Sequence, residues 1–174
     1  IGGAINLIST PIPSSDEGQL VQEIGDNGMM RTHAYLGGSN GTFGALLEMH
    51  EHSSDGFDSI ANVGGNTGFD KSDFMGKFRY STGDHELTLK IVEADEISDQ
   101  SYVGLSQASF NKNPRQRYGM TQYDEMANDA SQQSLTYKGS FGNIDVVATS
   151  WSNDYHRDWF NVDKANNKKA YGVS

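Results

Sequence analysis

Arg115, Arg117 and Tyr118 lie close together in the sequence and are the residues best suited to bind a ligand. A guanidinium group pairs with a carboxylate through two parallel hydrogen bonds, and an aromatic ring adds a rigid wall to such a site. Gln122 lies nearby and is counted with them. These residues predict a binding site for an anionic ligand. The alternative is a loop packed on its neighbours, with its arginines on phosphate groups or in solvent.

Glu48, His50 and His52 form a second group, because residues at alternate positions project to one face of a strand. Imidazole and carboxylate groups bind transition metals, so the three residues are weak candidates for a metal site. Polar side chains on a wet surface need no metal, and that interpretation is the simpler one. We therefore expect neither a resident metal ion nor a cofactor.

The run Gly37-Gly38-Ser39-Asn40-Gly41 matches the G-x-S-x-G pattern of serine hydrolases. That pattern activates a serine at a sharp turn from a strand to a helix, with histidine and acidic partners. Here both flanking segments alternate like strands, so the run predicts a hairpin turn. We expect no enzyme activity.

The composition limits the classes of protein to which the 174-residue chain can belong. It has no cysteine, which excludes disulfides and thiolate chemistry, and 8 Tyr, 8 Phe and 2 Trp are too many aromatic residues for a disordered chain. The formal net charge of −10 opposes binding to nucleic-acid phosphates. No apolar run approaches the roughly 18 residues of a membrane-spanning helix. Strands that alternate apolar and polar residues can still cross a membrane, because their hydropathy averages out.

Alternating residues predict about seven strands, separated by turn residues. The predicted strands are 18–26, 29–37, 42–53, 71–81, 85–95, 131–141 and 144–157. One outer, apolar face should contain Phe74, Phe78, Leu87, Leu89 and Ile91. Five further aromatic residues resemble anchors at a membrane interface, namely Tyr80, Tyr137, Trp151, Tyr155 and Trp159.

The connections between these strands alternate in length. The tight turns are at 38–41, 82–84 and 142–143, and the long loops are at 54–70 and 96–128. Only the Asn27-Gly28 turn breaks the pattern. Tight turns on one side and long loops on the other are typical of outer-membrane barrels. The expected fold class is all-β, an antiparallel up-and-down transmembrane β-barrel segment of about seven strands in an incomplete barrel. The alternative is a soluble β-sandwich or extended antiparallel sheet, whose strands would also alternate.

The first thirteen residues have a different sequence pattern from the alternating strands that follow. Gly2 and Gly3 let another backbone approach closely, and the apolar run from Ala4 to Ile8 predicts a short buried strand. Pro11 and Pro13 then fix an extended exit. This pattern is typical of the end of a domain. We therefore expect three parts, which are a domain end at 1–13, a linker at 14–17 and a strand-rich domain at 18–174.

The opening run Gly2-Gly3-Ala4-Ile5-Asn6-Leu7-Ile8 resembles the end of the plug domain in TonB-dependent outer-membrane receptors. The second long loop is similar to an early extracellular loop of ferric-citrate receptors and their relatives. The matching residues are Tyr102, Gly104-Leu105, Phe110, Asn113-Pro114, Arg117-Tyr118, Asp124 and Met126. Ser109 and Gly119-Met120 depart from the pattern. By this resemblance, residues 1–13 end a plug and 18–174 form the N-terminal part of a barrel.

The resemblance implies active import of a ferric siderophore or ferric citrate across the outer membrane of a Gram-negative bacterium. The implied partners are the metal chelate, outer-membrane lipid and lipopolysaccharide, and the TonB energy-coupling protein, which would act through a region upstream of Ile1. The arginine-rich loop would contact the substrate, at Arg115, Arg117, Tyr118 and Gln122. Two alternatives stay open. One is a passive porin or adhesin barrel, which lacks a plug, and the other is a soluble β-rich carbohydrate-binding module.

Overall fold

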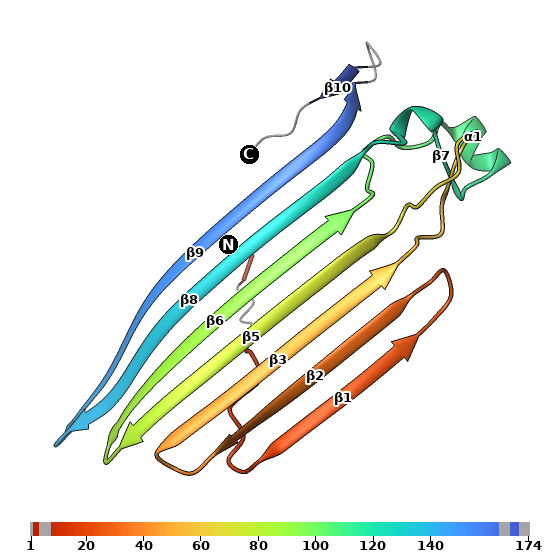
Figure 1. Ribbon diagram of the computed structural model, residues 1–174. Coiled ribbons are helices and arrows are strands. Elements are labelled where there is room, and N and C mark those ends of the chain that lie inside the picture. Colours follow the sequence, from red (N-terminus) through yellow and green to blue (C-terminus); the bar gives the residue numbers. More distant parts are fainter. Residues whose placement is uncertain (1, 4–7, 164–167, 171–174) are drawn as a thin grey trace.

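The computed structural model describes residues 2–3, 8–163 and 168–170, and most of these residues form one large antiparallel sheet (Figure 1). The long strands of this part of the chain are β1 (Glu17–Ile24), β2 (Met30–Ser39), β3 (Phe43–Ser54), β5 (Phe69–Thr82), β6 (His85–Ser98), β8 (Glu125–Phe141) and β9 (Ile144–Asp163). Each pairs with its neighbour in the chain, which gives the sheet up-and-down topology. The predicted all-β, antiparallel fold of about seven strands is confirmed. β1 and β9 lie toward opposite edges, so the described sheet is open.

Short elements lie between and beyond the long strands. β4 (Ser59–Ile60) and β7 (Gln116–Arg117) pair in parallel, and β10 (Lys168–Ala170) adds to the edge of β9. The short helices are α1 (Gln107–Lys112) and the 3-10 turn η1 (Gly119–Thr121). No helix in the described ranges has the length and apolar character needed to span a membrane.

Strands next to the second long loop extend beyond their predicted ends. β6 continues to Ser98 and β8 begins at Glu125, although alternation predicted ends at residues 95 and 131. Backbone pairing is the reason, because Ser98 is opposite Met126 and the ladder continues from there without interruption. Polar residues on both faces hide these strand ends from a pattern based on apolar residues. β9 likewise runs past its predicted end at residue 157.

The connections have the predicted arrangement, with tight turns at one end of the sheet and long loops at the other (Figure 1). The exception is again the β1–β2 turn, which is tight but lies at the loop end. Its Asn27 and Gly28 have φ angles of 57° and 64°, in the left-handed region that Asn-Gly turns use. The Asn27 carbonyl oxygen accepts a hydrogen bond from the Asp55 backbone N–H (2.8 Å), which ties this turn to the first long loop.

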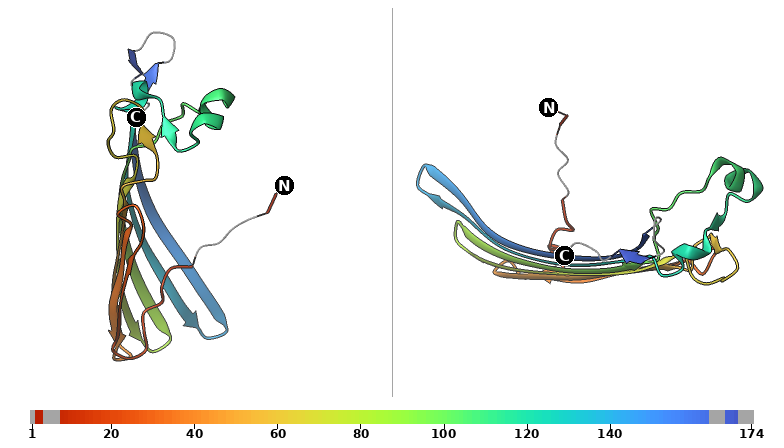
Figure 2. Two further views of the ribbon diagram at one scale, coloured as in Figure 1. Left: turned by 90° about the vertical axis from the view of Figure 1, so that its right-hand side faces the viewer. Right: turned by 90° about the horizontal axis from the view of Figure 1, so that it is seen from above.

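The two faces of the sheet differ in chemistry. Phe78 is opposite Leu89, and Leu89 is opposite Leu135, so these side chains share one face. Alternation along β5 and β6 places the whole predicted apolar set on it, namely Phe74, Phe78, Leu87, Leu89 and Ile91. That prediction is confirmed. The sheet is curved, and the N-terminal segment lies on its concave side (Figure 2). Because this segment contacts the polar face, the apolar face is the convex one.

Two of the five predicted aromatic anchors, Tyr80 and Tyr137, flank Leu87 on the convex face. The other three lie on the concave face, and they are Trp151, Tyr155 and Trp159. Tyr155 illustrates this placement, since its hydroxyl donates to Asn128 Oδ1 (2.9 Å). These three therefore do not share the face of the predicted apolar set, and interface anchoring stays a prediction. Because β9 has two adjacent valines, the sequence does not show which of its residues lie on which face of the sheet. The pairing with β8 determines this.

The N-terminal segment crosses the concave face of the sheet (Figure 2). Lys77 Nζ donates to the backbone oxygens of Ser9 (3.3 Å) and Thr10. Thr10 Oγ1 in turn donates to Glu48 Oε1 (3.0 Å). Side chains of β3 and β5 therefore hold the chain just before it enters the first strand.

The buried strand predicted for residues 4–8 falls on residues outside the described part of the chain, apart from Ile8. The Ile8 side chain is exposed, and this residue is not in a strand. The sheet begins at Glu17, at the end of the linker predicted for residues 14–17.

Candidate ligand-binding site in the two long loops

Residues 55–68 and 99–124, the two long loops, fold together into one unit that we call the loop cluster. β4 from the first loop pairs with β7 from the second, which puts Ile60 opposite Arg117. The α1 and β7 part of the cluster projects on the same side of the sheet as the N-terminal segment (Figure 2). Loops that are fixed in this way on a rigid sheet can present a preformed site.

Arg117 is buried in the loop cluster and stabilises it through hydrogen bonds. Its side chain is 8% exposed. Nε and Nη2 donate to Thr121 Oγ1 (3.1 Å) and to the Thr121 carbonyl oxygen (2.6 Å), and Nη1 donates to the carbonyl oxygen of Asp99. All three guanidinium nitrogens are therefore used inside the protein. The structure gives this predicted ligand residue a positioning role.

Other buried polar side chains stabilise the same loop. The buried polar side chains of the described residues lie in or beside the second loop, and they are Ser98, Arg117, Thr121, Asp124 and Asn128. Asp124 accepts from Ser101 Oγ at Oδ2 (2.6 Å) and from the Val162 N–H at Oδ1 (2.7 Å). Asp124 thus joins the loop to β9. Because buried polar groups are costly unless paired, these bonds define a specific loop conformation.

Tyr118 holds the start of α1. Its hydroxyl accepts from the Ser106 backbone N–H (2.9 Å) and donates to Ser109 Oγ (3.2 Å). Ser106 is the N-cap residue, with its own Oγ accepting from the Ser109 N–H (3.2 Å). Ser109, which departs from the receptor pattern, is therefore part of the cap. The tyrosine positions a helix that carries other residues of the site.

The structure does not bring the four predicted substrate residues together. Arg115 is exposed, and its guanidinium has no hydrogen-bond or ion-pair partner among the described residues. Gln122 is exposed too, but it lines a separate cavity of about 300 Å³ with Phe160 and Val162. Whether these side chains contact a ligand stays a prediction.

A cavity of about 680 Å³ lies between the two loops. Its chemistry comes from two kinds of side chain, aromatic and aliphatic on the one hand and acidic or amide on the other. The residues that define it are Phe57, Asp58, Asp99, Gln100, Leu105 and Phe110. Sequence analysis named Leu105 and Phe110 only for the family resemblance and did not identify the cavity, because the two loops meet through the β4–β7 pairing and through the bond from the Asp99 N–H to the Gly68 carbonyl oxygen (2.9 Å). The one signal in the sequence is the density of aromatic residues in a long loop.

Asp99 lines this cavity, and the pKa of its carboxyl group is raised. Burial in the loop cluster raises the pKa of its carboxyl, the positive charge of Arg117 opposes that rise, and Asp70 adds to it. A desolvated carboxylate favours a bound proton or a nearby cation. The cavity therefore has a group whose charged form would be stabilised by a cationic ligand.

The three weak metal candidates do not converge on one point. Glu48 Oε1 pairs with His33 Nε2 (2.7 Å), whereas His50 Nδ1 pairs with Asp73 Oδ2 (3.3 Å). The ring of His52 packs elsewhere, against an aromatic neighbour. In the described ranges, no three His, Asp or Glu side chains are grouped as a metal site would require. Glu48 and His50 instead belong to separate ion pairs on the concave face.

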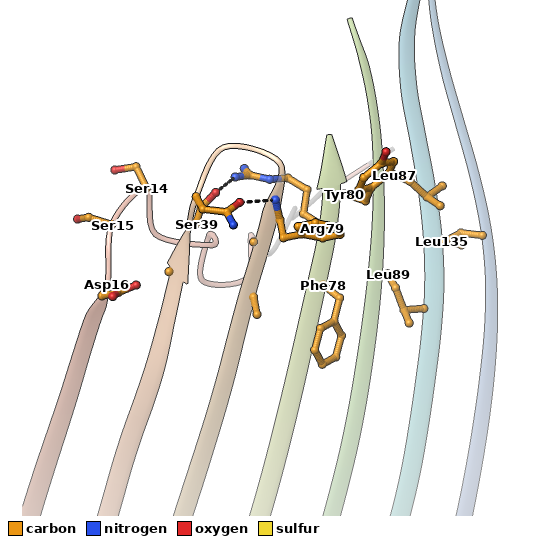
Figure 3. Close-up of a pocket in the computed structure, with 15 residues that line it drawn as sticks. Ser14, Ser15, Asp16, Ser39, Phe78, Arg79, Tyr80, Leu87, Leu89 and Leu135 are labelled. Atoms are coloured by element: carbon orange, nitrogen blue, oxygen red, sulfur yellow. Dashed lines mark hydrogen bonds between the residues drawn. The ribbon is translucent and has the colours of Figure 1, made fainter. Parts of the chain in front are cut away.

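Ser39 lies at the tight turn between β2 and β3, as the hairpin interpretation predicted. Its Oγ accepts from Arg79 Nη2 (2.7 Å), and no histidine contacts it among the described residues (Figure 3). The adjacent concavity of about 830 Å³ is lined by Phe78, Leu89 and Leu135 from the convex face and by polar residues that include Asp16, Ser39 and Arg79 (Figure 3). Its apolar part belongs to the exposed apolar face of the sheet, so the loop cluster is the better candidate site.

Comparisons of the chain with protein families, with curated proteins and with solved structures found no match.

Proposed function

We propose that this chain is part of a TonB-dependent outer-membrane receptor that imports a ferric siderophore or ferric citrate. In this proposal the seven-stranded sheet belongs to the barrel wall, and the segment before β1 is the end of the plug. The loop cluster faces the outside of the cell and captures the chelate. The TonB protein would deliver energy through a region preceding Ile1.

The oblique apolar band on the convex face is the observation that carries the proposal. On β1 and β2 this band reaches the loop end, at Ile24 and Met30, whereas on β8 and β9 it lies at the turn end, at Phe141 and Ile144. A membrane is a flat apolar layer, and barrel strands cross it at a tilt of roughly 35–45°, which produces a band of this kind. In keeping with that tilt, the tight turns lie near one level in Figure 1 although the strands run obliquely.

The exposure of the convex face argues against a soluble carbohydrate-binding module. Phe78 and Leu47, in the middle of the band, are 49% and 46% exposed. A soluble sheet normally covers an apolar face of this extent with a second layer. Behind the band, the concave face has charged side chains such as Glu48, Lys77 and Lys90, which suits a wet barrel interior.

The N-terminal segment favours a plugged receptor over a passive porin or an adhesin barrel. It crosses the concave face and is held there by Lys77 and Glu48. A porin needs an open passage along that face, whereas a plugged receptor needs a connection from its interior domain to the first strand. The position of the segment fits the second requirement.

The test uses the complete protein expressed in a Gram-negative host. It should sediment with the outer membrane, and the purified receptor should bind an iron chelate saturably at micromolar concentration, measured with radioactive iron. Recovery in the soluble fraction without detergent would favour the carbohydrate-binding module. Outer-membrane protein that binds no chelate would remove the iron part of the proposal, and free passage of small solutes into liposomes would favour a porin.

A further inference from the structure

One wall of the loop-cluster cavity is apolar. Phe57 and Phe110 line it from different loops and are 67% and 52% exposed, and Leu105 lies with them. Aromatic rings that stay in solvent beside a cavity offer a surface on which the apolar part of a ligand can pack. The volume of about 680 Å³ is in the range of small-ligand sites, roughly 300–1,000 Å³.

The cavity also has an acidic part, which consists of the carboxylates of Asp58 and Asp99. Neither carboxylate has a hydrogen-bond or ion-pair partner among the described residues, since Asp58 contacts Thr67 only through its backbone. Both side chains are half-buried, which weakens their hydration. An ammonium group would give each of them a charge-assisted hydrogen bond.

One positive charge lies beside these acids and offsets part of their charge. Arg117 lines the cavity and attracts the Asp99 carboxylate, but its three nitrogens donate to Thr121 and to the Asp99 carbonyl oxygen rather than to either carboxylate. Lys112 and Arg115 belong to the loop and do not line the cavity. A ligand that enters therefore meets a lining with net negative charge and two carboxylates without hydrogen-bond partners, which disfavours an anionic complex such as ferric citrate.

We propose that this cavity binds a ferric hydroxamate that has a pendant ammonium group. Three hydroxamates, each with one negative charge, neutralise Fe³⁺, so the metal core has no charge that the acids would repel. The ammonium group pairs with Asp58 and Asp99, and the aliphatic arms of the chelate pack on Phe57 and Phe110. This inference rests on the proposed function and specifies its substrate class.

The experiment compares two chelates that differ only in that charge. Ferric desferrioxamine B is a cationic trihydroxamate with a free ammonium, and its N-acetylated form is the neutral counterpart. The complete receptor in detergent is titrated with each, and with ferric dicitrate, by quenching of protein fluorescence at low salt. The cationic chelate should bind about tenfold more tightly than the acetylated one. Ferric dicitrate should bind at least tenfold more weakly.

The variant Asp58→Asn/Asp99→Asn keeps the size of both side chains and removes their charges. It should reduce the difference between the two hydroxamates to less than about threefold. Asp55→Asn is the matched control, because Asp55 is on the same loop but does not line the cavity. Lys112→Gln removes an exposed cation of the same loop outside the cavity, and it should leave hydroxamate binding unchanged. Heat-modified mobility on gels shows that each variant has a folded barrel.

Two results would overturn the inference while the receptor proposal survives. One is tighter binding of ferric dicitrate that is lost in Arg115→Ala. The other is equal affinity for the two hydroxamates in the unmodified receptor. If an outer-membrane receptor binds none of the three probes, iron import fails together with the inference.

Discussion

Arg115 and Arg117 are close in the sequence, yet their guanidinium groups have opposite surroundings. Arg117 is buried and donates to Thr121 and to the Asp99 carbonyl oxygen, whereas Arg115 is exposed and unpaired among the described residues. A buried guanidinium is tolerated only when its donors find acceptors, and here backbone and threonine oxygens supply them. Arg117 is therefore expected to stabilise the loop cluster rather than to select a ligand.

Arg117→Ala should loosen the loop cluster and leave the sheet intact. The change removes three donors, so the Thr121 carbonyl oxygen keeps only the Asp124 N–H and Thr121 Oγ1 keeps only its bond to the Tyr118 carbonyl oxygen, at a cost of about 3 kcal/mol to local stability. Hydrogen exchange followed by mass spectrometry should show faster exchange in residues 99–124 with unchanged strands. Arg115→Ala is the control and should have no effect. Equal protection of the loop in both variants would contradict the bracing role.

The sequence identified the residue types of this loop but not their directions. An arginine before a tyrosine has the same pattern whether its side chain enters a ligand site or the protein interior. Phe57 and Asp58 reach the cavity because the first loop contacts the second, through the β4–β7 pairing and through the bond from the Asp99 N–H to the Gly68 carbonyl oxygen. Two-residue strands have no periodicity to detect, so the cavity depends on pairing that the sequence does not display.

The N-terminal segment and the sheet are fitted to each other by glycines as well as by Lys77. A Cβ on Gly37 would lie 2.8 Å from Pro13 Cδ, and one on Gly44 would lie 3.0 Å from Ile12 Cγ2. These distances are too short for ordinary contacts, so the two glycines let the proline-rich exit lie directly on the strands. The segment is thus positioned by backbone proximity and by the hydrogen bonds of one lysine.

Lys77→Met should release this segment without changing the sheet. It removes the donor to the Ser9 and Thr10 oxygens, an interaction worth about 1 kcal/mol, while it keeps the length of the side chain. Because the chain has no cysteine, Ile8→Cys gives a single site for a spin label, whose mobility should increase by electron paramagnetic resonance.

Lys90→Met tests whether the N-terminal segment is held by the Lys77 hydrogen bonds or by the general charge of the concave face. Lys90 is directly opposite Lys77 on the same face, and no hydrogen bond joins it to the described N-terminal residues. The spin label should keep its restricted mobility in this variant. A similar increase for both lysine variants would mean that the general charge of the concave face, rather than the Lys77 bonds, holds the segment.

At the scale of elements, the sequence predicted strands well where one side of the alternation is apolar. β3, β5 and β6 have such alternation, and their positions and shared apolar face agree with the structure. The prediction failed where both faces are polar, at the start of β8, and where two valines are adjacent, in β9. In those places the hydrogen-bonded ladder, which involves every residue equally, determines the strand.

At the scale of the molecule, the sheet has an exposed apolar band on its convex face, and nothing in the described residues covers this band with a second layer. The alternation of turn lengths predicted this up-and-down order, because each hairpin contributes one turn to one end. The oblique course of the apolar band could not be predicted from single strands, since it depends on the register of all seven. In that register, the apolar residues of the seven strands lie side by side and form one continuous band.

A pair of adjacent residues in β8 can test whether this surface faces lipid. Leu135 is on the convex face between Leu89 and β9, whereas Ser134 faces the concave side opposite Lys90. In a membrane wall, Leu135→Arg places a charge in hydrocarbon at a cost of about 2 kcal/mol, whereas Ser134→Arg places the same charge in water, within about 0.5 kcal/mol. Urea titration of the complete protein in lipid vesicles should resolve this difference. Equal stability of the two variants would mean that both faces contact water, and the proposed barrel wall would then have to be abandoned.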